Sequence, residues 1–185
     1  NFILPMSHDE VVHMKGSVVG KMPGEYETQL QCLRGFIAYL LAHPGKKLMF
    51  MGAELGQWHE WNSNGQLDWY LLDQEANRKT QDFFRAINHF YLSQPALWEI
   101  DFDWAGFEWL VSDDNQNNVV VFLRKDKSGG ELVCAINFSP NTYEDYRFGV
   151  PPRRLFRQVF NTDDPAFGGS GVGNDKPVYV SGKPS

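Results

Sequence analysis

Apolar residues recur at two different periods along the first half of the chain. Between residues 25 and 43, and again between 75 and 93, they stand three and four positions apart, which predicts two helices with one buried face each. The His-Pro-Gly sequence at 43–45 is expected to end the first helix. The short apolar runs at 2–4 and 48–51 favour strands, and the second suits a parallel strand buried on both faces. Strand, helix, strand and helix in this order predict the βα units of an α/β fold.

The pattern changes after about Trp98, where short apolar and aromatic segments alternate with turn sequences. Such regular spacing favours an antiparallel β-sandwich. The expected strands cover residues 107–111, 119–123, 132–138, 146–150 and 157–160. The stretch at 161–175 is rich in Gly and Asp and is predicted to be a long loop. We therefore expect an α/β unit over residues 1–97 and an all-β unit over residues 98–185.

Composition narrows the class of protein. The 185 residues are 42% hydrophobic and 22% charged, as in globular proteins, and 15% are aromatic. The net charge of -6 argues against nucleic acid as the main partner. No apolar stretch approaches the roughly 18 residues of a membrane span, and no signal peptide is visible, so we expect a cytoplasmic protein without a membrane partner. Because the chain opens directly on apolar residues without an initiator Met, we interpret it as a piece of a longer protein.

The first candidate for chemistry is the segment Ser7-His8-Asp9-Glu10, directly after the first predicted strand. Reactive groups of parallel βα folds stand on loops at the carboxyl ends of strands, so His8 and Asp9 are well placed for catalysis. The alternative is a structural turn, because Asp and Glu are common in turns and caps.

Two other motifs are excluded by their spacing. His8, Glu10 and His13 do not form the His-Glu-x-x-His pattern that brings two zinc ligands onto one helix face. The Gly-rich stretch 168–173 fits neither the dinucleotide fingerprint nor a P-loop, and no Lys follows it. We therefore expect no metal and no organic cofactor.

The loop after the second predicted strand combines indole rings with amides and carboxylates. Trp58, Trp61 and Trp69 alternate there with polar residues that include Glu54 and Asp68. Flat aromatic faces beside paired donors and acceptors suit a sugar, whose ring stacks while its hydroxyls form hydrogen bonds. The alternative is that the Trp residues pack the seam between the two units.

Two long stretches closely resemble glycogen branching enzymes (1,4-α-glucan branching enzymes) of the α-amylase superfamily. The first is LPMSHDEVVHMKGS at residues 4–17, and the second is HPGKKLMFMGAELGQWHEWN at residues 43–62, followed by GQLDW at 65–69. The resemblance is looser in the β unit. It implies that residues 1–97 are the last part of a catalytic (β/α)8 TIM barrel, with residues 1–5 as strand seven and 47–52 as strand eight. Residues 98–185 would then be a C-terminal β-sandwich domain, truncated at its end.

The resemblance also implies roles for single residues. Asp9 matches the family's third catalytic carboxylate, which holds hydroxyls of the sugar at the cleavage point, and His8 matches the His that binds the same sugar. Glu54 falls on a superfamily motif at the end of strand eight, and Trp58 and Trp61 are the candidate sugar contacts beside it. Met14 departs from the family, which usually has Gly there. The substrate would be an α-glucan such as glycogen or amylose.

Retaining glycosyl transfer needs a nucleophile and a general acid about 5–5.5 Å apart. The family carries these two carboxyl groups on earlier barrel strands, and no residue of this chain matches either of them. We therefore expect the isolated chain to be an inactive part of a transglycosylase that cleaves α-1,4-glucan and forms α-1,6 branches. The alternatives are a glucan hydrolase of the same superfamily and a non-catalytic carbohydrate-binding module.

Overall fold

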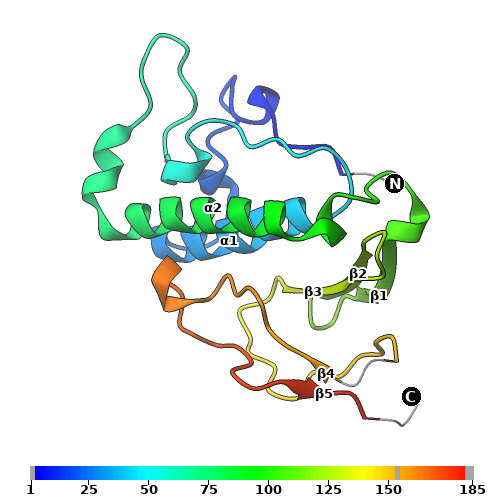
Figure 1. Cartoon of the computed structure of the whole chain (residues 1–185). Coiled ribbons are helices and arrows are strands. Elements are labelled where there is room, and N and C mark those ends of the chain that lie inside the picture. Colours follow the sequence, from blue (N-terminus) through cyan, green and yellow to red (C-terminus); the bar gives the residue numbers. More distant parts are fainter. Residues whose placement is uncertain (1–2, 153–154, 182–185) are drawn as a thin grey trace.

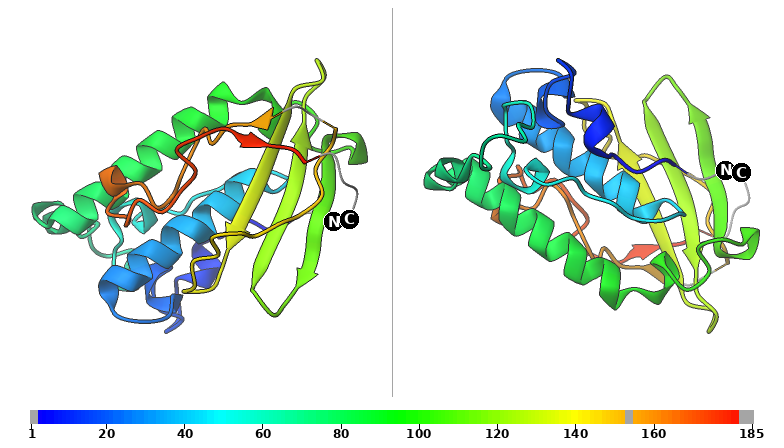
Figure 2. Two further views of the ribbon diagram at one scale, coloured as in Figure 1. Left: turned by 90° about the horizontal axis from the view of Figure 1, so that it is seen from below. Right: turned by 90° about the horizontal axis from the view of Figure 1, so that it is seen from above.

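The computed structural model describes residues 3–152 and 155–181. Its centre is a pair of helices, α1 (Tyr26–Ala42) and α2 (Glu75–Ser93), which lie side by side and run in the same direction (Figures 1 and 2). The first and last residues of both helices lie within one residue of the bounds that the spacing of apolar residues predicts. Parallel neighbouring helices are the arrangement that successive βα units produce, because each helix returns the chain to the same edge.

The helices pack through the faces that the sequence predicts. The buried face of α1 presents Leu30, Leu33 and Ile37 to the Phe83–Phe84 pair and Ile87 of α2. Leu33 and Phe83 are completely buried, and the rings of Phe83 and Phe84 meet edge to face at 5.7 Å between centroids. Fully burying a side chain of this kind contributes about 1.5–3 kcal/mol to the stability of the folded chain. The contact between these two helix faces is therefore the core of the first unit.

A three-stranded antiparallel sheet follows, in the order β1 (Phe107–Asp114), β2 (Val119–Lys125) and β3 (Glu131–Asn137). A second, two-stranded sheet pairs β4 (Leu155–Phe156) with β5 (Val178–Tyr179), and Figure 1 shows it below the first. Central strand β2 is buried on both faces, and the ring of its Phe122 packs against Tyr39 and His43 of the first unit. The prediction of an antiparallel C-terminal β unit is confirmed.

Two predicted strands of this β unit are wrong. Residues 146–150 form no strand, and 157–160 follow the short strand β4 as irregular chain. Phe160 packs instead between Phe83 and Phe90 of α2, at 6.3 and 4.9 Å between ring centroids. The aromatic ring of the segment 157–160 therefore packs on α2 and does not belong to a sheet.

The strands predicted at 2–4 and 48–51 are also absent from the described residues, with Phe2 lying outside them. The two segments nevertheless lie close together over α1. Ile3 and Pro5 of the first line one small cavity together with Leu48 and Met49 of the second. A strand requires hydrogen-bonded neighbours, and no further strand of a parallel sheet is present in the described residues to supply them. The described part of the chain thus does not show a TIM barrel.

The predicted loop at 161–175 is confirmed as a loop with one short 3₁₀ turn at Pro165–Phe167. Arg34 of α1 holds it by donating to the carbonyl oxygens of Thr162 at 3.1 Å and Gly168 at 3.3 Å. Asp163 accepts hydrogen bonds from Ser170 and Val172 within the loop. Arg34 therefore anchors this loop to α1, and Asp163 holds its Gly-rich part together.

Candidate functional site

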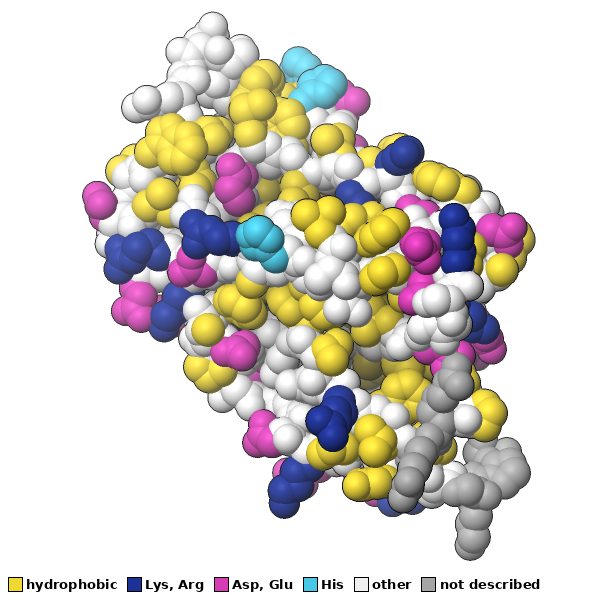
Figure 3. Space-filling view, in the orientation of Figure 1, with side chains coloured by type: hydrophobic (Ala, Val, Ile, Leu, Met, Phe, Trp, Pro, Cys, Tyr) yellow, Lys and Arg dark blue, Asp and Glu magenta, His cyan; other side chains and the backbone are white. Residues whose placement is uncertain are grey.

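The candidate site lies on two loops, residues 6–24 and 52–68, at the upper end of the molecule in Figure 1. Each loop follows one of the two segments that the sequence predicts as barrel strands. Figure 3 shows histidine side chains beside hydrophobic ones on the surface at this end.

A capped 3₁₀ turn (His8–Glu10) presents the first candidate residues. Glu10 Oε2 accepts a hydrogen bond from the Ser7 backbone N–H at 2.5 Å, while Ser7 Oγ accepts one from the Asp9 N–H at 3.2 Å. This capping box satisfies the free N–H groups of the turn. The hydrogen bonds from Ser7 also hold the pKa of Glu10 below its usual value. Glu10 is therefore part of the cap that holds the turn in place.

His8 and Asp9 point out of this turn. Their side chains are 58% and 69% exposed, and His8 Nε2 lies 3.2 Å from Asp9 Oδ1. The ring of His8 also lies 6.5 Å from that of Phe50, in the segment that precedes the second loop. An exposed carboxylate beside an imidazole can accept hydrogen bonds from a ligand that approaches this edge.

The second loop begins with a turn between two glycines in the left-handed region, Gly52 at φ 94° and Gly56 at φ 63°. Glu54 lies between them, and its Oε2 accepts a hydrogen bond from the Gly52 N–H at 2.8 Å. That bond fixes the turn that brings the chain from the apolar segment 48–51 into the loop. One carboxylate oxygen of the predicted substrate-binding Glu54 is therefore already engaged in local structure.

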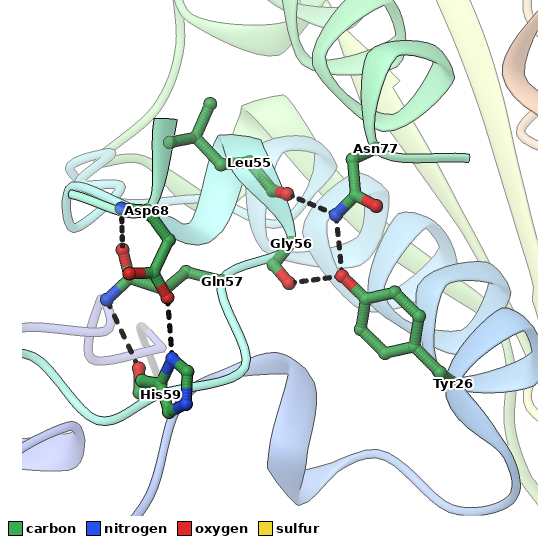
Figure 4. A network of polar contacts seen from close by, with 7 residues as sticks. All are labelled: Tyr26, Leu55, Gly56, Gln57, His59, Asp68 and Asn77. Carbon is green, nitrogen blue, oxygen red and sulfur yellow. Dashed lines mark hydrogen bonds and ion pairs between the residues drawn. The ribbon is translucent and has the colours of Figure 1, made fainter. Parts of the chain in front are cut away.

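Two helix residues hold this turn through hydrogen bonds to its backbone, as Figure 4 shows. Tyr26 Oη donates to the Gly56 carbonyl oxygen at 2.6 Å, and Asn77 Nδ2 donates to the Leu55 carbonyl oxygen at 2.7 Å. The amide of Asn77 also donates to Tyr26 Oη at 2.6 Å. Burial raises the pKa of the Tyr26 hydroxyl, so this group remains a donor. Sequence reasoning missed both residues, because they stand on α1 and α2 with no local motif.

A second set of contacts in Figure 4 closes the far side of the loop. Gln57 Oε1 accepts from the Asp68 N–H at 3.1 Å, and Gln57 Nε2 donates to the His59 carbonyl oxygen at 3.2 Å. His59 Nδ1 lies 2.8 Å from Asp68 Oδ2. These residues, with Trp61 and Asn62, line an open hollow in the loop.

The two loops are joined by backbone and side-chain contacts. The Trp61 N–H donates to the Val11 carbonyl oxygen at 3.2 Å. The carboxylate of Glu60 accepts from the N–H groups of Met14 at 3.0 Å and Gly16 at 2.8 Å. The indole of Trp61 meets the Phe50 ring edge to face at 5.4 Å, so Phe50 lies between Trp61 and His8.

The predicted site residues thus fall into two groups. His8 and Trp61 both contact Phe50, where the two loops meet, and Asp9 lies beside His8. Glu54 stands in the turn held by Asn77 and Tyr26, and Trp58, which is 50% exposed, packs its indole on the Tyr26 ring at 5.9 Å. The Trp cluster of the sequence is therefore divided between these two places, with Trp69 half exposed on a separate 3₁₀ turn.

Over residues 3–152 and 155–181, no three His, Cys, Asp or Glu side chains gather as a metal site requires. The helices found in the same ranges are all too short or too polar to cross a membrane.

Comparison with known proteins gives two concordant results. The family model described as "Alpha amylase, C-terminal all-beta domain" matches residues 109–185. The chain is 51% identical over 183 residues to the 1,4-alpha-glucan branching enzyme GlgB of Rhodopseudomonas palustris, which covers 98% of the chain and 26% of that protein. It is 48% identical over 185 residues to the enzyme of the same name from Desulfitobacterium hafniense, covering all of the chain and 29% of that protein.

A third relative, the 1,4-alpha-glucan branching enzyme GlgB of Aquifex aeolicus, is 49% identical over 175 residues, or 94% of the chain and 28% of that protein. The chain therefore spans between a quarter and a third of the length of these curated relatives. The resemblance seen in the sequence is confirmed over nearly the whole chain.

Proposed function

We propose, from the homology of this chain to the 1,4-alpha-glucan branching enzymes, that it is the C-terminal part of such an enzyme. The parent protein would cleave an α-1,4 linkage of a glucan, hold the glucosyl group covalently and transfer it to a 6-hydroxyl, which forms an α-1,6 branch. The observation that carries this proposal is the identity of 45–51% to enzymes of that name over nearly the whole chain. The proposed reaction needs no metal or organic cofactor.

The proposed fold follows from the same homology. Residues 1–5 and 47–52 would be the seventh and eighth strands of a TIM barrel, completed by strands outside this chain. The parallel direction of α1 and α2, and the neighbouring positions of Ile3 and Leu48 over α1, support this proposal. The two candidate loops would then lie at the carboxyl ends of these strands, where barrel enzymes place their active sites.

Asp9 would act as the third carboxylate of the reaction, and His8 would bind the same sugar. An exposed carboxylate accepts strong, charge-assisted hydrogen bonds from sugar hydroxyls. If these bonds shorten while the ring flattens toward an oxocarbenium ion, they lower the barrier and not only the dissociation constant. The nucleophile and the general acid would come from the part of the protein that precedes this chain.

The remaining candidates would shape the glucan groove. Trp61, whose indole contacts the same Phe50 ring as His8, would offer an apolar wall, and Trp58 offers a half-exposed indole face. Glu54 would act mainly through the turn that it fixes, because Gly52 donates to its carboxylate. The ligand would thus be an α-glucan chain that runs across both loops.

Product linkage analysis of the longer protein that carries this chain tests the proposal. With amylose as substrate, we expect new α-1,6 linkages and no rise in reducing ends, because the anomeric carbon freed by cleavage is joined to a 6-hydroxyl and not to water. New reducing ends without α-1,6 linkages would instead identify a hydrolase. If Asp9→Ala leaves product formation unchanged, Asp9 takes no part in the reaction, as the alternative of a non-catalytic binding module predicts.

A further inference from the structure

Glu60 makes the main side-chain connection between the two loops of the candidate site. Its Oε1 accepts from the Met14 N–H at 3.0 Å, and its Oε2 accepts from the Gly16 N–H at 2.8 Å. Directly after it, the Trp61 N–H donates to the Val11 carbonyl oxygen at 3.2 Å. Three hydrogen bonds therefore join the first loop to the second, of which two are accepted by Glu60 and one is donated by Trp61.

The backbone of the first loop is shaped to meet this carboxylate. His13 and Met14 have φ values of 58° and 65°, in the left-handed region that side chains other than Gly seldom adopt, and Gly16 follows at φ 74°. Left-handed backbone can direct neighbouring N–H groups to one side, which creates a concave anion site. The Met14 side chain is 97% exposed and so gains nothing from packing there. The hydrogen bonds that the Glu60 carboxylate accepts therefore offset the energetic cost of this left-handed backbone.

The fastened segment is connected to Asp9 through one residue. Lys15 lies between the two N–H groups that Glu60 accepts from, and its Nζ donates to the Asp9 carbonyl oxygen at 2.6 Å. Lys21 in turn holds the Lys15 carbonyl oxygen. The position of the His8–Asp9 turn relative to the second loop therefore depends on the Glu60 contacts.

We infer that Glu60 is a positioning residue for Asp9: it holds the first loop against the second and so sets where the Asp9 carboxylate meets the sugar. This inference rests on the proposed function, because it assumes that Asp9 acts on a glucan. The positioning role requires that the Glu60 side chain is ionised, so that both of its carboxylate oxygens can accept hydrogen bonds. The N–H groups of Gly16 and Met14 hold the pKa of Glu60 below its usual value, so these contacts favour the ionised carboxylate.

Glu60→Gln in the full-length protein tests the inference. The amide keeps the size of the side chain but turns one acceptor into a donor, which would face one of the two N–H groups. We expect kcat on amylose to fall about 10- to 100-fold, as for small displacements of a catalytic group, with KM changed less than about three-fold. Glu75→Gln is the matched control, because Glu75 pairs with Lys79 on the surface of α2 and lies outside both loops. It should leave both constants unchanged.

The assays are run well below the melting temperature of each variant, so that a loss of stability does not count as a loss of turnover. If Glu60→Gln does not fold, Glu60→Asp is measured against the same thresholds, since its shorter carboxylate cannot span both N–H groups in the same way. An unchanged kcat, or a raised KM with unchanged kcat, would overturn the inference. Asp9→Ala separates the two proposals: if it retains full kcat, the proposed function fails, whereas a loss there with normal Glu60→Gln activity removes only the role of Glu60.

Discussion

The guanidinium of Arg124 on β2 is completely buried and donates to Asp101 Oδ1 at 2.9 Å. The same side chain donates to the carbonyl oxygens of Ala42 at 2.5 Å and Leu97 at 3.1 Å. One side chain of the β unit thus donates hydrogen bonds to a carbonyl oxygen at the end of α1 and to another in the segment after α2. These contacts fix how the sheet sits on the helices, and hence on the elements that carry the two loops.

Arg124→Met should lower the free energy of unfolding by about 3–5 kcal/mol, because it leaves the Asp101 carboxylate buried without its partner. Chemical denaturation measures the change. Arg147→Met is the control, since Arg147 pairs with Asp145 in solvent and its loss should leave the stability unchanged within error. Equal effects of the two substitutions would show that the Arg124 contacts do not hold the seam together.

Tyr26→Phe should cost about 1–3 kcal/mol of stability, because it removes the donor to Gly56 and leaves a buried carbonyl oxygen unpaired. The turn that contains Glu54 should also become more mobile, which amide hydrogen exchange at Leu55 and Gly56 would report. Tyr179→Phe, on an exposed tyrosine of β5, provides the comparison and should change neither quantity. Unaltered exchange in Tyr26→Phe would contradict the account of this turn.

Two glycine substitutions should have opposite effects on stability. Gly16→Ala meets open space but has a φ of 74°, so strain should cost about 1–2 kcal/mol. Gly35→Ala also meets open space, but inside α1, where Ala is favoured by about 1 kcal/mol. Thermal unfolding of both variants should therefore shift in opposite directions. A rise in the melting temperature of Gly16→Ala would mean that the backbone of the first loop is not left-handed at Gly16.

Lys47 should make stability depend on alkaline pH. Burial lowers its pKa from 10.5 to about 8, while Nζ contacts the His43 carbonyl oxygen and lies over the Tyr91 ring. Because the unfolded chain binds the proton more tightly, this residue makes stability rise with pH between about 8 and 10.5. Lys47→Met should remove that rise and increase stability at pH 7, measured by denaturation at both ends of the window. A difference between the two proteins that does not change with pH would refute the burial of a charged lysine here.

The sequence predicted the helices well because their apolar faces are long and periodic, as at Leu30, Leu33 and Ile37. It also located the three strands of the main sheet. It failed at 146–150 and 157–160, where a few apolar residues look like a strand but Phe160 is used by α2. Strand formation depends on distant partners, which local patterns do not contain.

The candidate site shows the same division. The position of His8 and Asp9 on a loop could be read from the sequence, because the residues are adjacent and follow an apolar run. The support from Tyr26, Asn77 and Glu60 could not, since each acts on a loop far away along the chain. The role of Glu54 as a ligand of the substrate stays a prediction, and the sequence did not show that one of its carboxylate oxygens accepts from Gly52 two residues away.

The most direct test of the central claim is the rate of α-1,6 linkage formation by the full-length protein with Asp9→Ala. If Asp9 stabilises the transition state, the rate should fall about 100- to 1,000-fold, as when one transition-state contact is lost. Asp82→Asn, which changes an exposed carboxylate of α2, should retain the full rate. A rate of branch formation in Asp9→Ala equal to that of the unmodified protein would contradict the account.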